Sequence, residues 1–551
     1  MKIIKGVATL AAIAVFTLLQ ACSNSDDSMP MDHTLVTTNS GQLRGIELDN
    51  GVNAWLGVRF AQPPTQELRW QPPQPMQWDG IYNADRKMSE CMQILRPHNI
   101  NHYFGEESTS EDCLFMNIWA PADAMPDSGL PVIVFIYGGG GTVGSSGMPS
   151  YGGETVAERG AIFVNFNYRV GLLGFMAHPE LTAEQGGHSG NYAYLDQNAA
   201  LRWINENIAQ FGGDPGKVVI TGQSAGAGAV TQQIFSPLSK GLFAGAMLSS
   251  GCSWGGSNQT LAAGEAVGLQ VQEALGAANL EELRYVPADR IIDIQQESQL
   301  GASVQGYRAT GVIDGYFMPA SQMEILEAGG NSDVPIIAHY NSHESNSPLT
   351  RATTVAEYEN YARQMYGAAA DEFLALFPVA TDADVWAQSR AAATAGRLEA
   401  NARNCGVLQS QYNQSPTFVS EFGRKHPYVP GVQIADQNIE TIGAYHTGDI
   451  PYWFGTQDAF NMFRPTRDWT QYDRDMSAAM TAALMALAET GNPSTAEYPW
   501  PAWSPAVEVK MLWADDIGVQ PPNVQAIEFL ASHQAMPVEL PPEPPRVGPR
   551  D

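Results

Sequence analysis

Lys217-Val-Val-Ile-Thr-Gly-Gln-Ser-Ala-Gly-Ala-Gly-Ala229 is the stretch that decides the fold. Its β-branched run 218–220 predicts a strand buried on both faces, and the small residues after Ser224 predict the start of a helix. Gly222 and Gly226 flank the serine in the pattern G-x-S-x-G, which is typical of a nucleophile elbow. Such a sharp turn needs residues without a Cβ on both sides, and the helix then aims N–H groups at a developing oxyanion. We therefore predict Ser224 as a nucleophile; a glycine-rich turn that only caps a helix is the alternative.

The rest of the chain alternates strand and helix patterns around this stretch. Residues 191–211 have near-helical apolar spacing, and short apolar runs predict strands at 131–137, 161–167, 245–250, 334–340 and 417–422. This alternation predicts an α/β fold with a large, mostly parallel central sheet covered by helices on both faces. Residues 34–58 predict a small antiparallel meander before it, and residues 62–75 an extended surface segment. In such a sheet the site lies beyond the carboxyl ends of the strands.

Composition places the chain among ordinary globular proteins. Of its 551 residues, 44% are hydrophobic and 16% are charged, and no linker-like break is visible between residues 35 and 535. The formal net charge of −29 repels phosphate backbones, so we expect no nucleic-acid partner. A field of this sign favours neutral or cationic substrates, although a solubility or salt adaptation is the simpler explanation.

The N-terminus is typical of an exported protein. Residues 1–21 have a basic start and an apolar core too short to span a membrane, and they predict a signal peptide. Leu19-Gln-Ala-Cys22 resembles a bacterial lipobox, so we expect lipidation of Cys22 and a flexible tether over residues 22–34. An ordinary signal peptide with an incidental cysteine is the alternative. Ser23 resembles sorting to the bacterial outer membrane, so we expect a chain held there, on the periplasmic or outer face, by its lipid anchor only.

Four consecutive glycines, Gly138-Gly-Gly-Gly141, follow the predicted strand at 131–137. Such a run costs conformational entropy, which indicates a selected reason for it. It frees backbone N–H groups to point at one spot, as the second half of an oxyanion hole requires. A merely flexible loop is the alternative.

A serine nucleophile needs a base that takes its proton and a carboxylate that orients the base. In sheets of this kind the chain order is Ser, then Asp or Glu, then His. Glu344 follows the predicted strand at 334–340 and is the candidate acid, and His446 follows the last strand and is the candidate base. The competing residues are the acids Asp314, Glu421 and Asp449, the polar-loop histidine His426, and His533 in a terminal helix.

Laid out in this order, the residues resemble the type-B carboxylesterase family, which includes cholinesterases and bacterial para-nitrobenzyl esterases. The resemblance covers most of residues 35–530 and has the family's motifs in the family's order. These motifs are Arg69-Trp70, Glu111-Asp-Cys-Leu-Phe-Met-Asn-Ile-Trp119, Asn167-Tyr-Arg-Val-Gly-Leu-Leu-Gly-Phe175, Phe211-Gly-Gly-Asp-Pro215, the elbow, Val312-Ile-Asp-Gly315 and Gly443-Ala-Tyr-His446.

The resemblance implies an α/β-hydrolase domain over residues 35–536, followed by a proline-rich tail at 537–551. It also implies a set of roles: Ser224 as nucleophile, Glu344 as acid, His446 as base, the N–H groups of Gly139, Gly140 and Ala225 as oxyanion hole, Ser250 as a hydrogen-bond donor near the acid, a Cys91–Cys113 disulfide, and an Arg69–Glu111 ion pair beside it. Cys252 and Cys405 could pair or stay buried thiols, and the sequence leaves this open.

Three positions depart from the family pattern. Gln223 stands where glutamate is usual before the nucleophile, and His343 replaces the acidic neighbour of Glu344. Gly141 replaces a bulky residue, which should widen the pocket or loosen the glycine loop.

The expected function is hydrolysis of a small-molecule carboxylic ester through an acyl-enzyme, with no metal or organic cofactor. The alternatives are hydrolysis of carbamates, lactones or bulky natural-product esters, and a non-catalytic binding protein of the same fold. Neither the natural substrate nor the oligomeric state follows from the sequence.

Overall fold

The structure, a computed structural model, describes residues 32–94, 108–256, 258–299, 303–434, 438–538 and 540. The predicted signal peptide, Cys22, and most of the tether and of the proline-rich tail lie outside the described residues. Within the described ranges, no helix has the length and apolar character needed to cross a bilayer.

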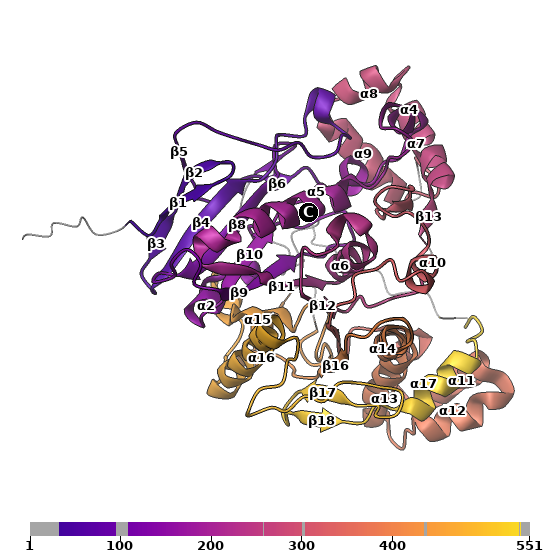
Figure 1. The fold of residues 1–551 in the computed structure, drawn as a ribbon. Helices are drawn as coiled ribbons and strands as arrows, with labels where there is room; N and C mark the ends of the chain where they lie inside the picture. Colours follow the sequence, from indigo (N-terminus) through magenta and orange to yellow (C-terminus); the bar gives the residue numbers. More distant parts are fainter. Residues whose placement is uncertain are drawn as a thin grey trace, which may run out of the picture.

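An eleven-stranded sheet forms the centre of the molecule (Figure 1). From one edge to the other its strands are β18 (Gly518–Gln520), β17 (Lys510–Trp513), β16 (Thr417–Phe422), β15 (Ile336–Asn341), β12 (Gly245–Ser249), β11 (Gly213–Gln223), β9 (Leu130–Ile136), β10 (Ile162–Phe166), β8 (Phe115–Pro121), β4 (Val52–Arg59) and β3 (Ile46–Leu48). The pairs from β17 to β10 are all parallel, and the pairs outside them are antiparallel. The prediction of a mostly parallel sheet is confirmed.

The central strands form because apolar residues cover both of their faces. Every residue of β10 and all but the first of β9 are buried, as a sheet covered on both sides requires. The strand register brings the carboxyl ends to one edge, where Gly222 pairs with Ile136 in β9 and with Leu248 in β12. Ser249 in turn pairs with His339 in β15. The segments that follow these four strands therefore begin side by side.

The predicted N-terminal meander is divided between two sheets. β1 (Leu35–Thr38) and β2 (Gly41–Arg44) form a hairpin that pairs with β5 (Ile81–Asn83), whereas β3 and β4 form a second hairpin within the main sheet. The division follows burial, since most residues of β4 are buried while β1 and β2 expose about every other residue. The run 62–75, expected to be extended, contains one short 3₁₀ helix, η1 (Gln66–Leu68).

Helices cover both faces of the main sheet. α5 (Tyr192–Asn207) and α6 (Ala225–Phe235) lie on one side, and α15 (Ile450–Phe454) and α16 (Gln471–Thr490) lie on the other (Figure 1). The remaining elements of the outer layers are α2 (Glu154–Glu158), α3 (Gly171–Gly174), α4 (Pro179–Glu184), α7 (Leu261–Leu275), α8 (Leu280–Tyr285), α9 (Ala288–Gln299), α10 (Gln322–Glu327), α14 (Ala400–Tyr412), and the short strand pairs β6 (Glu90–Cys91) with β7 (Thr109–Ser110) and β13 (Gln259–Thr260) with β14 (Val312–Ile313).

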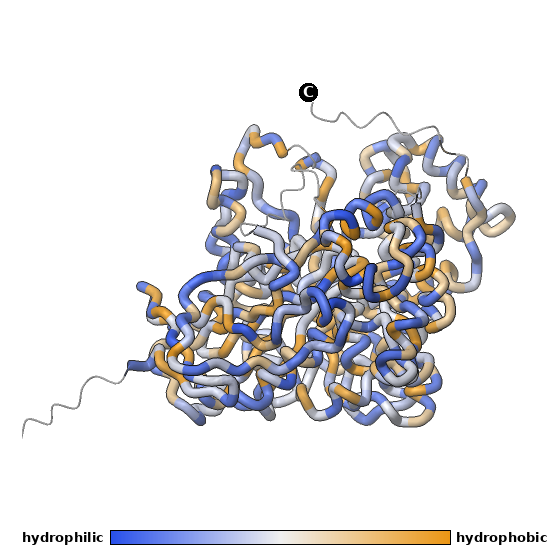
Figure 2. The backbone as a smooth tube through the Cα atoms, turned by 90° about the horizontal axis from the view of Figure 1, so that it is seen from above, coloured by the Kyte–Doolittle hydropathy of each residue, from blue (hydrophilic) through white to orange (hydrophobic). Residues whose placement is uncertain are grey.

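A second hydrophobic core lies apart from the main one. Its helices are α11 (Val355–Tyr366), α12 (Ala370–Leu376), α13 (Asp382–Thr394) and α17 (Val524–Ser532), which gather at one corner of the molecule (Figure 1, lower right). Tyr358, Phe373 and Phe529 are among its buried side chains. Along the described residues, hydrophobic and hydrophilic stretches alternate (Figure 2), as amphipathic elements packed around a core require.

Candidate active site

Ser224 lies at the turn between β11 and α6. Its φ of 58° and ψ of −125° are strained for a residue with a side chain. A Cβ on Gly222 would lie 2.3 Å from the carbonyl oxygen of Gly226, and a Cβ on Gly226 would lie 2.1 Å from that of Ile136. Only glycine fits at these two positions, so strand and helix approach as closely as the predicted elbow requires.

The glycine loop runs beside this serine. A Cβ on Gly138 would lie 2.9 Å from the Cβ of Ser224, and Gly139 and Gly140 have positive φ angles of 106° and 66°. Ala225 is the first residue of α6, where the N–H groups have no acceptor within the helix. Gly138 and Ala225 thus lie beside the serine, and Gly139 and Gly140 continue the loop directly after Gly138.

The expectation that Gly141 widens the pocket or loosens the loop is wrong. An added Cβ would meet the carbonyl oxygen of Ala309 at 2.5 Å and the ring of Phe175 at 3.3 Å, so the space is already filled. The N–H of Gly171 donates to the carbonyl oxygen of Gly141 at 2.7 Å and fixes the end of the loop. The missing side chain admits a neighbouring segment of the chain rather than a larger ligand.

Glu344 lies in the acid loop (residues 341–346), directly after β15. Its side chain is 2% exposed. Oε1 accepts hydrogen bonds from Ser250 Oγ at 2.7 Å and from the Asn341 N–H at 2.8 Å, and Oε2 accepts one from Nδ1 of His446. The buried carboxylate is therefore fully occupied, and its bond to Ser250 agrees with the place expected for that serine.

His446 lies in the base loop (residues 441–446), and 42% of its side chain is exposed. Burial alone would lower the pKa of His446, but the hydrogen bond and the negative charge of Glu344 raise this pKa above its ordinary value of 6.5. Asp449 adds to the increase in pKa, and the positive charge of Arg397 works against it. Because Nδ1 donates to Glu344, the neutral ring has an unprotonated Nε2.

The serine and the histidine are brought together less closely than the histidine and the acid. Among the hydrogen bonds between described residues, none joins Ser224 Oγ to His446. Instead Nε2 of Gln223, the residue before the serine, lies 3.2 Å from Nε2 of His446. Nucleophile–base contacts are often long in unliganded enzymes and tighten when substrate binds.

The competing acids and histidines have other partners. Asp314 accepts hydrogen bonds from two backbone N–H groups, Glu421 pairs with Lys510, and His533, the residue after α17, stacks on Phe529. His426, expected in a polar loop, is instead 2% exposed among aromatic rings, and burial lowers its pKa to about 3.

Asp449 belongs to a buried polar network near the acid loop, which the sequence analysis did not predict. Asp449 accepts hydrogen bonds from Ser249 Oγ at 2.8 Å and Asn341 Nδ2 at 3.0 Å, and it lies 3.3 Å from Nε2 of His339. Burial would raise the pKa of Asp449, but its contact with His339 and the hydrogen bonds from Asn341 and Ser249 lower it to about 2. Polar residues inside the apolar strands β12 and β15 were the available signal.

Two disulfides and one ion pair brace the region. Cys91 is bonded to Cys113, and Cys252 to Cys405, so the second pairing that the sequence left open is settled as a disulfide. Arg69 pairs in bidentate fashion with Glu111, at 2.7 and 2.6 Å. In the part of the chain that the structure describes, no group of three or more His, Cys, Asp or Glu side chains could hold a metal ion.

Comparisons with known proteins bear on the family and the fold of this chain. The model of the carboxylesterase family matches residues 32–516. A fumonisin B1 esterase of Sphingopyxis macrogoltabida is 37% identical over 376 residues, which are 67% of this chain and 66% of that protein, slightly under two thirds. A para-nitrobenzyl esterase of Bacillus subtilis (strain 168) is 28% identical over 497 residues, 89% of this chain and 96% of that protein. A solved PNB esterase structure aligns with a TM-score of 0.73 and 26% identity, over 90% of this chain and 99% of that one.

Proposed function

The chain is a carboxylic ester hydrolase of the carboxylesterase family, and we propose that it acts through a Ser224–His446–Glu344 triad and an acyl-enzyme intermediate. The observation that carries this proposal is the bond from Nδ1 of His446 to the buried Glu344, formed at the sheet edge where the elbow presents Ser224. A carboxylate in this place fixes the tautomer and orientation of the ring that serves as base.

In the proposed acylation step, Nε2 of His446 takes the proton of Ser224 while Oγ attacks the ester carbonyl carbon. The N–H groups of Gly139, Gly140 and Ala225 hold the negative oxygen of the tetrahedral intermediate. His446 then returns the proton to the leaving alcohol. Water, activated by the same histidine, attacks the acyl-enzyme and releases the acid. For Ser224 to reach Nε2, the side chain of Gln223 must give up its contact with that nitrogen.

The test is hydrolysis of p-nitrophenyl esters of increasing acyl length by the wild-type chain and by Ser224→Ala. We expect turnover by the wild type and a loss of kcat on the order of 10⁶-fold in the variant, since removing such a nucleophile abolishes the covalent path. A folded wild-type protein that hydrolyses no ester in the panel would refute the proposal and would favour a non-catalytic binding protein. Carbamates and lactones in the same panel decide between bond classes.

A second candidate concerns the natural substrate. The identity of 37% to a protein named fumonisin B1 esterase favours an ester of that kind over a simple alkyl ester. Mass spectrometry after incubation with fumonisin B1 should show a product of ester hydrolysis. If fumonisin B1 stays intact while p-nitrophenyl esters are cleaved, this candidate is wrong and the esterase proposal stands.

The cellular place of the enzyme is a separate proposal, supported by Leu19-Gln-Ala-Cys22 outside the described residues. We propose that Cys22 carries a lipid that anchors the chain to an outer membrane. Cys22→Ser should move the protein from the membrane fraction to the soluble fraction. Unchanged fractionation would contradict lipidation.

A further inference from the structure

The acid loop and the base loop touch each other directly. The N–H of His343 donates to the carbonyl oxygen of Ala444 at 3.1 Å, and the N–H of Ala444 donates back to Nδ1 of His343 at 3.0 Å. Nδ2 of Asn341 adds a hydrogen bond to the carbonyl oxygen of Tyr445 at 2.7 Å. These bonds join His343 and Asn341 of the acid loop to Ala444 and Tyr445 of the base loop, so the two loops are held in a fixed position relative to each other.

The imidazole of His343 lies between Trp386 and the base loop. Its ring stacks on Trp386 with centroids 4.8 Å apart and planes inclined by 28°. A Cβ on Gly443 would lie 2.6 Å from Nδ1, so the base loop closes on the ring where it has no side chain. Burial lowers the pKa of His343 to about 4; the negative charge of Glu421 works against this decrease, and the positive charge of Arg390 adds to it. The ring is thus neutral near pH 7, and its Nδ1 accepts, because a backbone N–H can only donate.

One face of α13 supports both loops from outside. Trp386, Arg390 and Thr394 are spaced by four residues and therefore share a face of the helix. Trp386 Nε1 donates a hydrogen bond to the carbonyl oxygen of Thr441 in the base loop at 2.9 Å. Two further bonds reach the acid loop: Arg390 Nη1 donates to the carbonyl oxygen of Ser345 at 3.1 Å, and Thr394 Oγ1 donates to the carbonyl oxygen of Ser342 at 2.7 Å.

We propose that His343 is a positioning residue whose Nδ1, braced by Trp386, locks the base loop onto the acid loop so that His446 meets Glu344 in a fixed geometry. This role presupposes the proposed function, because the relative position of the loops matters for turnover only if those two residues act on Ser224. A misplacement of about 1 Å at a catalytic group can cost about 10²-fold in rate.

The test compares His343→Leu, which removes the acceptor, with His343→Asn, whose Oδ1 can take the place of Nδ1. With p-nitrophenyl butyrate we expect His343→Leu to lose about 10- to 100-fold in kcat with KM nearly unchanged, while His343→Asn stays within about threefold of the wild type. The acid limb of kcat/KM should also move to lower pH in His343→Leu, because a looser bond to Glu344 holds the proton of His446 less tightly. A residue with only a structural role would not move this limb.

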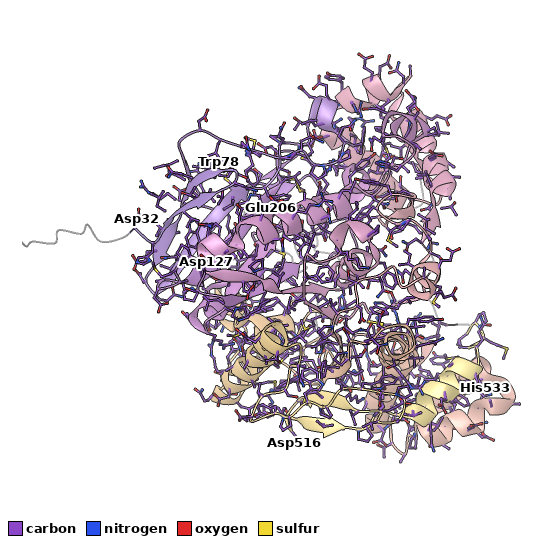
Figure 3. All side chains as sticks on the ribbon, viewed as in Figure 1. Asp32, Trp78, Asp127, Glu206, Asp516 and His533 are labelled. Carbon is purple, nitrogen blue, oxygen red and sulfur yellow. A yellow bond between two sulfur atoms is a disulfide. The ribbon has the colours of Figure 1, made fainter. Side chains whose placement is uncertain are left out.

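Matched controls separate positioning from general damage. His188→Leu removes another partly buried histidine that stacks on an aromatic ring: the ring centroids of His188 and Tyr316 lie 4.1 Å apart. Trp386→Leu withdraws the brace without touching the acceptor, and it keeps the proposal testable if His343→Leu does not fold. Trp78→Leu is its control, since Trp78 also contacts an aromatic ring, that of Tyr82, and donates to a carbonyl oxygen, at the other end of the molecule from α13 (Figures 1 and 3).

The outcomes are distinct. A wild type without esterase activity would refute the proposed function itself. With an active wild type, losses of kcat in His343→Leu and Trp386→Leu but not in His343→Asn, His188→Leu or Trp78→Leu establish the positioning role. Full activity in folded His343→Leu would overturn the positioning role, and so would equal losses in His343→Leu and His343→Asn. If His343→Leu does not fold, full activity in Trp386→Leu would overturn the role.

Discussion

The elbow and the two loops that face it are held in different ways. Ser224 is fixed by the backbone alone: the carbonyl oxygens of Gly226 and Ile136 leave no room for a side chain at the flanking glycines. Glu344 and His446 are instead held by hydrogen bonds between segments: Ser250 Oγ and the Asn341 N–H donate to Glu344, and the Asn341 side chain donates to the carbonyl oxygen of Tyr445 in the base loop. One half of the site is therefore a rigid product of local sequence, and the other half is an assembly.

This difference predicts how each half fails. A change at the elbow has no flexible neighbour that could absorb it, so folding and activity should be lost together. A change in the supports of Glu344 leaves the sheet intact, so activity should fall more than stability. Three experiments test the contrast.

The largest effect is expected at the elbow. In Gly226→Ala the new methyl group would lie 2.1 Å from a backbone oxygen, which forces strand and helix apart. We expect a loss of about 3 kcal/mol in the free energy of unfolding, the upper end for overpacking, and a loss of kcat/KM of at least about 10²-fold. Urea denaturation and p-nitrophenyl ester kinetics measure the two quantities.

Gly228→Ala is the matched control two residues along the same helix. A Cβ there meets nothing within 4 Å, so alanine should stabilise the helix by about 0.5–1 kcal/mol and leave kcat/KM unchanged. If both variants behave alike, the crowding at Gly226 is not what holds the elbow.

A smaller effect is expected from Ser250→Ala. The variant removes a hydrogen bond to a charged carboxylate, worth about 1.5–3 kcal/mol, so kcat/KM should fall about tenfold or more. Ser345→Ala is the control, because the buried hydroxyl of Ser345 makes no hydrogen bond with the described residues although it is next to Glu344. Equal kinetics in the two variants would show that the assembly tolerates loss of this support.

The smallest effect is a shift of the pH profile. The base must be neutral, and the pKa of His446 is raised by Glu344, so the acid limb of kcat/KM should have its midpoint above 6.5. Glu344→Gln should lower the midpoint, and Arg397→Gln should raise it slightly. Stability depends on pH in the opposite direction from activity. The contribution of this raised pKa to the free energy of unfolding is complete below the unfolded-state pKa of His446, and it is lost as pH rises through the folded-state pKa.

A wild-type midpoint below 6.5 in the pH profile, measured on a substrate whose acylation limits the rate, would show that Glu344 does not hold the proton as the geometry indicates.

The same contrast explains what sequence could and could not predict. The elbow, the glycine loop and most of the parallel strands depend on residues close together in the chain, so their patterns predicted them with boundaries close to those observed. The expectation that His446 follows the last strand is wrong, because β17 and β18 come after it in the chain. The residue order also pointed to Glu344 and His446. Three other features depend on side chains that come together from segments far apart in the chain, and no local periodicity indicates them. They are the hydrogen bonds of His343 between the two loops, the face of α13 that supports these loops, and the buried network around Asp449. The wrong expectation at Gly141 has this cause too, because the atoms that fill the space belong to Ala309.

The bond between Cys252 and Cys405 joins chain positions 153 residues apart, two residues after Ser250 and in the middle of α14. Closing so long a loop restricts the unfolded chain by about 5 kcal/mol in the chain-entropy model. Glutathione in a host cytosol would keep this pair, and Cys91 with Cys113, as free thiols. The folded protein therefore depends on the redox state of the compartment in which it is produced, and an oxidising compartment is the rational choice for making this enzyme.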